Sequence, residues 1–539
     1  MADPEVKLPP HPLDGQDTNS NPNIIRDESR KRPNDEPPHN KGQDGDDLSE
    51  NEEIVWHYLT HETELPSPTH VRSSQSRENC SQPPACPDLK KFTSPFLWSD
   101  NRKTFITGLS CAATVVTAYT AGSYAMGDDQ MSAEWGVSSV TISLGITVFT
   151  IGFAIAPMFL APFSEITGRR PVFVSTGILF VVFQLCCAVT RSYAGMLISR
   201  FLAGCVSSTF STMVGGVVSD IYHADNRNTA MSLFSGAALF GTGLGPLVSG
   251  FIGQNTTWRW IFRVQVISCG ILMAILVIFF QETRGSVLLS KKAKVLNKWY
   301  DSMESEGYYG VLMPTEEGEK CLPQRIRWKV KSDEERGSLG QMIRISLYRP
   351  FYMLFTEPVV FFFSLWVAFG WAVLYLTFSA IPVVFQTSHN FTLQQTAAVF
   401  TSMCVASIFS TIISIYQERI ARRLLPPSRK QIFGTPEGRL YFACIQSVLL
   451  PVGCFWFGWS SFPSVPWIVP TLAIGCATMG IFSIYLAVFN FLADVYHRYA
   501  SSALAAQSFL RNILGGAFPL FTPQMFRQMT FQGAGSLLG

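Results

Sequence analysis

The chain alternates between long apolar runs and short polar links. The apolar runs lie at about 104–126, 141–163, 171–191, 194–218, 229–252 and 260–281, and then, after a polar stretch, at 354–385, 394–416, 439–459, 467–490 and 504–526. Each run is long enough for a helix that crosses a bilayer, which takes about 20 residues. The pattern predicts an all-α polytopic membrane protein with six spans, a long loop and five further spans.

The two ends of the chain depart from this pattern. Residues 1–95 are polar and rich in Pro, Asn, Asp and Glu, so they cannot bury enough apolar surface to offset the entropy of ordering. From Phe531 to Gly539 a further apolar run begins, but so few residues rise only about 14 Å as a helix. We therefore expect a disordered tail at the start and a twelfth span that is truncated at the end.

These boundaries divide the chain into four parts. We expect a disordered cytoplasmic tail at 1–95, an N-terminal bundle of spans 1 to 6 at 96–281, a cytoplasmic inter-bundle loop at 282–352, and a C-terminal bundle at 353–539 with spans 7 to 11 and the start of span 12. Within the loop, Leu288–Tyr300 is basic and amphipathic. It predicts either a helix that lies on the anionic inner leaflet or a solvated helix that ties the two halves together.

The distribution of Lys and Arg among the links predicts the orientation. One alternate set of links is basic, with Arg169, Arg170, Arg227, many residues of 282–350, Arg419, Arg422, Arg423, Arg429, Lys430 and Arg498. The other set has only Arg191, Arg259 and Arg527, and its first member is acidic. The tail is on the same side as the basic set, so we expect a cytoplasmic N-terminus in a multi-pass protein of the plasma membrane.

Composition agrees with a membrane protein and argues against other classes. Charged residues are 15% of the chain, whereas soluble domains have about 25%. The net charge of +2 has mixed signs and gives no basis for a nucleic-acid partner. The sequence has no nucleophile–base pair, metal-ligand spacing or phosphate loop, so we expect neither an enzyme nor a bound metal or cofactor.

Three short motifs lie in or between the predicted spans. The link at 161–172 reads Ala-Pro-Phe-Ser-Glu-Ile-Thr-Gly-Arg-Arg-Pro-Val, the fourth span opens with Ser199-Arg200-Phe-Leu-Ala-Gly, and the fifth contains Gly241-Thr-Gly-Leu-Gly-Pro-Leu-Val-Ser-Gly250. Gly168 permits a tight turn. Arg200 lies within a span, where an arginine costs about 2.5–3.5 kcal/mol and must find a partner or a wet cavity.

Two bundles with these motifs in this order resemble the major facilitator superfamily. Within it, the chain is similar to the fungal twelve-span drug/proton antiporters, which include polyamine and multidrug exporters, at Trp258–Gln265, Glu282-Thr283, Arg349-Pro-Phe, Phe355–Pro358, Tyr375–Pro382 and Ser502–Asn512. The link resembles the signature G-x-L-x-D-R-x-G-R-[RK], with departures at Ala161, Phe163 and Ile166 and matches at Glu165, Gly168, Arg169 and Arg170. Arg200 matches R-F-x-x-G. The fifth-span motif resembles G-x-x-x-G-P-x-x-G-G through Gly241, Gly245, Pro246 and Gly250, with Ser249 in place of one glycine.

The resemblance implies roles for these residues. Glu165, Arg169 and Arg170 would form a cytoplasmic gate latch, for which we expect Asp220 and Arg511 as ion-pair partners; the alternative is that the two arginines only set topology. Arg200 would take part in proton coupling, or else reach the outer headgroups. The fifth-span motif would form a kinked, tightly packed seal that favours export.

The resemblance also implies a substrate cavity between spans one, four, seven and ten. Aromatic and hydroxyl side chains there suit flat, amphipathic or cationic organic molecules, although each is also a plausible packing residue. The candidates are Tyr119, Ser123, Tyr124, Ser208, Trp371, Tyr375, Phe378, Tyr485, Phe489 and Asn490.

The sequence thus predicts a monomeric, proton-driven antiporter that exports drugs, toxins or a secondary metabolite from within the lipid bilayer. One alternative is a carrier for polyamines or other small solutes. Another is a truncated or sensor-like membrane protein that does not transport. Its partners would be a small-molecule substrate and protons, without nucleic acid.

Overall fold

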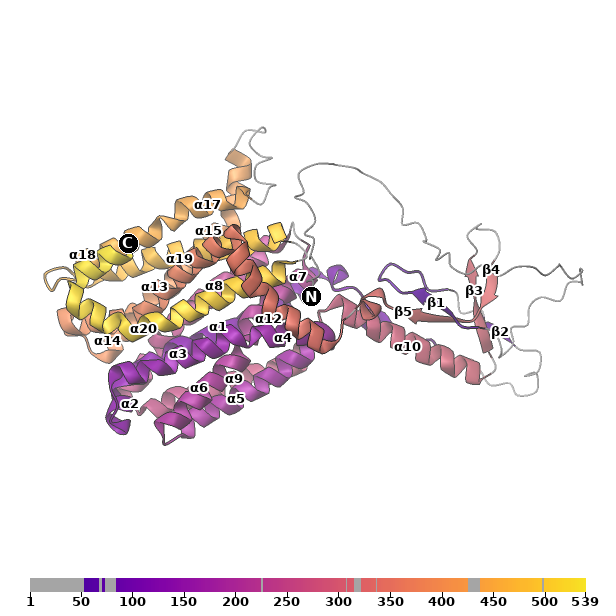
Figure 1. Ribbon diagram of the computed structural model, residues 1–539, viewed down its shortest axis with the longest axis horizontal. Helices are drawn as coiled ribbons and strands as arrows, with labels where there is room; N and C mark the ends of the chain where they lie inside the picture. Colours follow the sequence, from indigo (N-terminus) through magenta and orange to yellow (C-terminus); the bar gives the residue numbers. More distant parts are fainter. Residues whose placement is uncertain are drawn as a thin grey trace, which may run out of the picture. The chain divides into compact units, whose positions relative to one another are not determined.

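The computed structural model describes residues 53–66, 70–72, 84–223, 226–306, 308–314, 321–335, 337–424, 437–496 and 499–539 (Figure 1). The predicted tail at 1–52, 67–69 and 73–83 lies outside these residues, as do Arg429, Lys430 and Arg498. The described chain is mainly helical, and the helices of the apolar runs lie side by side in Figure 1.

Each of the first six apolar runs is helical. Their helices are α1 (Asp100–Ser123) with η4 (Tyr124–Gly127) and α2 (Asp128–Trp135), α3 (Ser139–Ile155) with α4 (Pro157–Thr167), α5 (Arg169–Val189), α6 (Tyr193–Ser207) with α7 (Thr209–Ile221), α8 (Arg227–Asn255) and α9 (Trp258–Phe279). Helix α1 packs on α8, α3 on α6, and α5 on α9. These pairs form the first half of the bundle.

The second half contains the other five runs. Its helices are α13 (Pro358–His389), α14 (Leu393–Val399) with α15 (Thr401–Leu424), α17 (Gly438–Ser447) with α18 (Leu449–Ser460), α19 (Ile468–Tyr496) and α20 (Ala500–Leu538). Helix α20 breaks at Thr530, which has φ 62°, and its last part packs through Gly535 on Gly458 of α18. The two halves meet where α8 packs on α14 and α15, and α20 on α3.

Membrane-spanning character follows from length and hydropathy. Among the described residues, nine helical segments satisfy both conditions, and α3 with α4, which bend by 41°, make a tenth if the bent pair is one span. Helix α20, which contains the predicted span at 504–526, is not among them. We call the end of the bundle near Arg169, Arg284 and Arg349 the basic end. The opposite end, near Asp128 and Asp129, is the acidic end.

A small α/β unit lies outside the apolar helices. Helix α10 (Gly285–Ser305) packs on β5 (Ile326–Lys329), which pairs in parallel with β1 (Val55–Tyr58). A second sheet joins β2 (His70–Arg72), β3 (Tyr308–Pro314) and β4 (Cys321–Gln324) in antiparallel order. Three short helices flank these strands in the chain, namely η2 (Lys90–Phe92), η3 (Pro95–Leu97) and α11 (Lys331–Glu334). The longer helix α12 (Leu339–Thr356) packs on α4, α13 and α20 of the bundle.

This unit corrects two predictions. The disordered tail does not extend through Val55–Tyr58, because these residues find backbone partners in β5 that no local pattern reveals. The amphipathic helix is present, but Leu289, Leu296 and Tyr300 are buried against Leu59, Val311, Ile326 and Trp328. Since protein covers its apolar face, the helix does not lie on a lipid surface with that face.

Candidate functional site

The turn between α4 and α5 is built around Gly168. Its backbone has φ 102° and ψ 161°, a region that is essentially restricted to glycine. A Cβ atom here would lie 2.8 Å from the carboxyl carbon of Glu282 and closer still to Oε2. Glycine is therefore required twice, for the backbone angle and for the space that Glu282 occupies.

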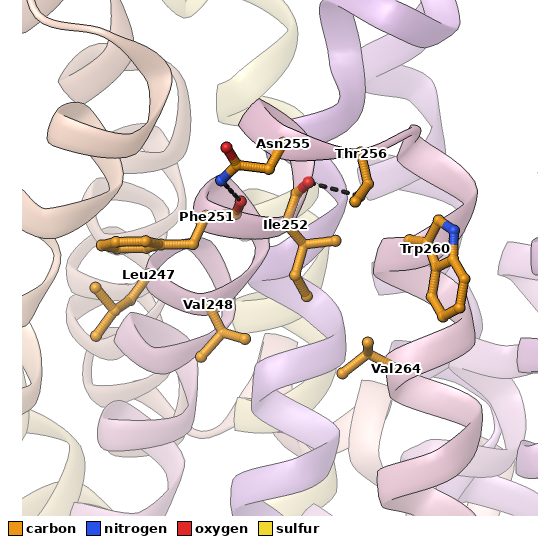
Figure 2. Close-up of a pocket in the computed structure, with 8 residues that line it drawn as sticks. All are labelled: Leu247, Val248, Phe251, Ile252, Asn255, Thr256, Trp260 and Val264. Atoms are coloured by element: carbon orange, nitrogen blue, oxygen red, sulfur yellow. Dashed lines mark hydrogen bonds between the residues drawn. The ribbon is translucent and has the colours of Figure 1, made fainter.

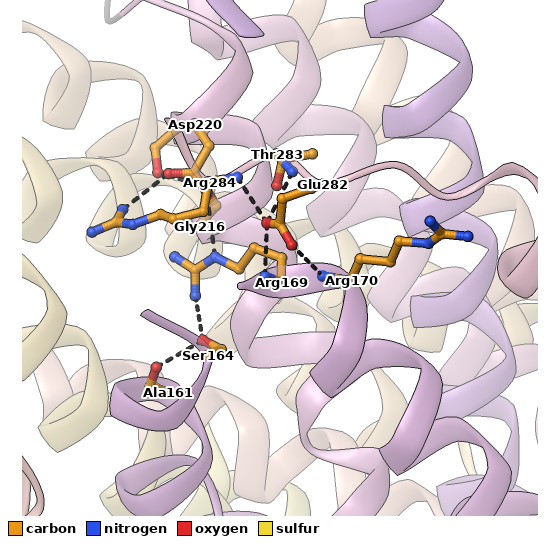
Figure 3. Close-up of polar contacts among 10 residues, drawn as sticks. Ala161, Ser164, Arg169, Arg170, Gly216, Asp220, Glu282, Thr283 and Arg284 are labelled. Carbon is orange, nitrogen blue, oxygen red and sulfur yellow. Dashed lines mark hydrogen bonds and ion pairs between the residues drawn. The ribbon is translucent and has the colours of Figure 1, made fainter. Parts of the chain in front are cut away.

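Glu282 fills that space because it caps the N-terminus of α5 (Figure 3). Its Oε1 accepts hydrogen bonds from the backbone N–H groups of Arg169 at 2.8 Å, Thr283 at 3.1 Å and Arg284 at 3.0 Å. Its Oε2 accepts from the backbone N–H of Arg170 at 3.2 Å. A carboxylate suits this place, since the first N–H groups of a helix lack internal partners and carry partial positive charge.

The Arg169 side chain joins the turn to the end of α7. Its Nε lies 3.2 Å from Oδ2 of Asp220, and its Nη1 donates to Ser164 Oγ at 2.7 Å. Arg284 Nη1 lies 3.1 Å from the other oxygen of Asp220. The Arg169 and Asp220 side chains are only 7% and 8% exposed, whereas that of Arg284 is 33% exposed. One buried carboxylate thus serves two arginines (Figure 3).

The remaining predicted latch residues lie elsewhere. Glu165 is half-buried and forms no ion pair within 4 Å among the described residues, although its charge helps to raise the pKa of Arg284, which burial alone would lower. Arg170 is exposed and donates through Nη2 to the Val277 carbonyl at 3.1 Å. Arg511 lies over the rings of Trp371 and Tyr485 and forms no ion pair with the link in this conformation. A latch that closes when the protein opens outward stays a prediction.

Arg511 faces a cavity of about 680 Å³ between the two halves of the bundle. The cavity runs from exposed residues at the basic end, such as Ser219 and Ser501, to the buried Tyr485 and Arg511 inside. Helices α4, α7 and α8 of the first half and α12, α19 and α20 of the second supply most of its walls. Both Glu165 and Arg169 also line it, so the turn borders the cavity.

The sequence-predicted cavity residues fall into three groups. Tyr485 and Phe489 line the large cavity, and Asn490 lines a separate cavity of about 50 Å³. Trp371, Tyr375 and Phe378 form a buried row of rings in α13 beside Tyr485, with centroids 5.3 Å apart between Trp371 and Tyr485. The rest are buried outside the lining of either cavity: Tyr119, Ser123, Tyr124 and Ser208.

Arg200 is fully buried nearer the acidic end. Its Nε donates to the Gly145 carbonyl at 3.3 Å and its Nη1 to the Thr120 carbonyl at 3.2 Å. The guanidinium carbon lies 4.7 Å from the ring centroid of Tyr124 and 4.3 Å from that of Phe149. Among the described residues, no carboxylate lies within ion-pair distance of it. The side chain is thus enclosed by protein.

The glycines of the fifth-span motif mark close helix contacts. A Cβ at Gly241 or Gly245 would collide with the backbone of α1, and one at Gly250 with Ala397 of α14. Pro246 lies against Gly122 of α1. The motif therefore packs α8 between α1 of its own half and α14 of the other half, at the acidic end.

A separate apolar groove lies between α8 and α9 at the acidic end (Figure 2). Its polar members are bonded within their own helix, since Asn255 Nδ2 donates to the Phe251 carbonyl at 2.9 Å and Thr256 Oγ1 to the Ile252 carbonyl at 2.7 Å. The other walls are Leu247, Val248, Trp260 and Val264. This apolar surface suits lipid chains better than a polar substrate.

Sequence reasoning missed several residues of the site. The sequence placed Glu282 at the end of the sixth span but gave neither it nor Arg284 a part in the site, although their charges beside the span were the available signal. Arg227 pairs with Asp494 at 2.8 Å and so joins the two halves beside the cavity. No spacing in the sequence links these two residues. In the described ranges, no group of three His, Cys, Asp or Glu side chains could hold a metal ion.

Comparisons with known proteins agree with this architecture. The family described as Major Facilitator Superfamily matches residues 104–519. The multidrug transporter mdrA of Aspergillus fumigatus is 33% identical over 82% of this chain and 69% of its own, and the efflux pump FUBT of Fusarium oxysporum is 30% identical over 80% and 68%. The xylose transporter XylE from E. coli, in an inward open conformation, shares the fold with a TM-score of 0.54, at 13% identity over 81% of this chain and 94% of that one.

Proposed function

The chain belongs to the major facilitator superfamily, and we propose that it is a proton-coupled antiporter that exports small organic compounds across the plasma membrane. It is a multi-pass membrane transporter and not an enzyme. Relatives named as multidrug transporters and efflux pumps support export as its direction. We further propose that a single chain suffices for transport.

The observation that carries the proposal is the cavity of about 680 Å³ between the halves. It reaches the basic end, whereas at the acidic end Gly250 and Gly253 of α8 lie against Ala397 and Leu393 of α14. A binding space between two halves, accessible from one side, is what alternating access requires. With the basic end in the cytoplasm, as the Lys and Arg distribution favours, this conformation would take up substrate from inside the cell.

Proton coupling would use Arg200 together with Asp128. Asp128 begins α2, directly after η4, and its Oδ1 is buried without a hydrogen-bond partner. The two side chains influence each other electrostatically, and Tyr124 of η4 lies under the Arg200 guanidinium. A carboxyl that exchanges a proton beside a fixed cation would change the balance of charge at the acidic end, where the halves meet.

Export from loaded cells tests the proposal. Cells that express the full chain are loaded with fluorescein or rhodamine 6G, and dye release is followed with and without a protonophore. We expect protonophore-sensitive efflux that Arg200→Ala and Asp128→Asn abolish and that Arg191→Ala, in an exposed link, leaves intact. Radiolabelled spermine uptake without any dye efflux would instead identify a polyamine carrier. Absence of both fluxes from a correctly inserted chain would favour a membrane protein that does not transport.

A further inference from the structure

Arg511 is a buried cation without a counter-charge. The residue is 3% exposed, and its guanidinium carbon lies 4.5 Å from the ring centroid of Trp371 and 5.0 Å from that of Tyr485. Its Nε is buried and has no hydrogen-bond partner, and no carboxylate of the described residues forms an ion pair with it. Ring faces attract a cation, but they neither neutralise its charge nor accept its directional hydrogen bonds. The guanidinium therefore retains unused binding capacity.

The other charges of the cavity do not offset Arg511. The side chains that line it include five arginines and one carboxylate, namely Arg169, Arg227, Arg284, Arg349, Arg511 and Glu165. Asp220 forms ion pairs with Arg169 and Arg284, and Asp494 forms an ion pair with Arg227. Arg349 lies over the ring of Tyr499, 4.9 Å from its centroid. The cavity thus has cationic side chains at its mouth and at its inner end, an arrangement that concentrates anions and repels cations.

The chemistry of the inner end defines what would fit there. A guanidinium presents a planar fork of donors that matches a carboxylate and can bind it through two hydrogen bonds. Tyr485 and Phe489, whose ring centroids are 6.2 Å apart, offer an apolar wall beside that fork. An aromatic body with one carboxylate would satisfy both features, whereas a polyamine would satisfy neither.

We propose that the transported compounds are organic anions of this kind, and that Arg511 binds their anionic group. The inference rests on the proposed transport function and defines its substrate class, but the binding itself requires no proton gradient. The proposal changes one expectation from the sequence, in which the aromatic residues suggested cationic molecules as possible substrates. The arginine expected in a gate latch becomes the centre of substrate recognition.

Binding to the purified full chain in nanodiscs tests this proposal. Three naphthalenes of matched size serve as probes, namely 2-naphthoate, the neutral 2-naphthamide and the cationic 2-naphthylmethylammonium, with affinities measured by isothermal titration calorimetry. We expect naphthoate to bind at least about tenfold more tightly than the amide, because a charge-assisted pair replaces a neutral contact, and the cation to bind most weakly. Equal affinities, a preference for the cation, or no binding of naphthoate would overturn the proposal.

Variants locate the preference. Arg511→Gln should weaken naphthoate binding by about tenfold and leave the amide unchanged, since only the anion uses the guanidinium charge. Arg511→Lys should retain part of the preference. Arg344→Gln, which removes an exposed arginine of α12 that does not line the cavity, is the matched control and should keep the full preference. Survival of the full preference in a folded Arg511→Gln protein would exclude Arg511 as the site.

The binding experiment and the efflux experiment fail separately. A naphthoate preference without protonophore-sensitive efflux would retain the anion site and reject the proposed antiporter. Efflux of dyes without any naphthoate preference would retain the antiporter and reject the anion site.

Discussion

Gly168 and Glu282 occupy a single small volume where α4 meets α5, since a Cβ at Gly168 would lie 2.8 Å from the Glu282 carboxyl carbon. The two residues lie far apart in the sequence, yet each requires the other. The missing side chain of Gly168 admits the carboxylate, and the carboxylate caps the helix that begins at Arg169. The basic motif therefore has a structural role, because it joins α4 and α5 through the capped N-terminus of α5.

Gly168→Ala should damage this joint. The substitution forces an L residue into a glycine-only backbone region, which costs about 1–3 kcal/mol, and it also displaces Glu282 from the N–H groups of α5. We expect lower thermal stability and strongly reduced dye efflux, with membrane insertion retained. Gly108→Ala is the control, because a Cβ at Gly108 of α1 meets nothing within 4 Å. Equal efflux by both variants would show that the turn is not needed for transport.

Asp220→Asn should be more damaging than the loss of either arginine beside it. It leaves Arg169 and Arg284 without their shared counter-charge, and breaking such a buried pair costs about 3 kcal/mol or more. Arg284→Gln should cost less than about 1 kcal/mol, because that side chain is one-third exposed. Thermal melts of purified Asp220→Asn, Arg169→Gln and Arg284→Gln proteins would rank the three, with the exposed Asp129→Asn as control. A larger loss for Arg284→Gln than for Asp220→Asn would contradict the geometry.

Hydropathy and local motifs predicted the helices well, since every apolar run is helical and nine, or ten with the bent pair, have the length and hydropathy of a membrane span. They did not predict how each helix is rotated. Arg511 was expected to pair with the link at 161–172, whereas in this conformation it lies over the ring of Trp371. Rotation depends on packing between helices that are distant in sequence. For the same reason, no sequence pattern paired Arg227 with Asp494.

The strands outside the bundle escaped prediction because their pairing is non-local. Val55 and Ile326 are partners across the parallel β1–β5 pair. Each strand is short and lies within a polar segment, so neither can be recognised from its own sequence. What stabilises them is a shared core with α10, in which Trp328 is 3% exposed. Local composition predicts disorder here because it contains no information about a strand partner so far along the chain.

Trp328→Ala should therefore release the tail strand without unfolding the bundle. Truncating a buried tryptophan costs about 3–5 kcal/mol, and this loss would fall on the small α/β unit. We expect faster hydrogen exchange in residues 53–59 and 285–305, with unchanged exchange in α13 and α19. Trp56→Ala is the matched control, because Trp56 lies on the paired strand but is 53% exposed. Release by both variants alike would argue against the buried core as the cause.

Docking of the tail should also depend on pH through His61, whose Nε2 lies 3.3 Å from the Gly285 carbonyl at the start of α10. Burial lowers the pKa of this imidazole, the hydrogen bond to Gly285 opposes that effect, and the charge of Lys292 adds to it. The docked tail thus favours neutral His61, whereas a released tail has the ordinary pKa of 6.5. The contribution to stability is complete above pH 6.5 and is lost as the pH falls below that value toward the lowered pKa.

Hydrogen exchange at pH 7.5 and pH 5.5 measures this dependence, once intrinsic rates are corrected with an unstructured peptide of residues 53–66. We expect β1 to lose protection at pH 5.5 relative to pH 7.5. His61→Gln cannot take up the proton, so it should remove most of the difference between the two pH values while keeping β1 docked at pH 7.5. If the variant retains the full pH dependence, another group controls the docking of the tail.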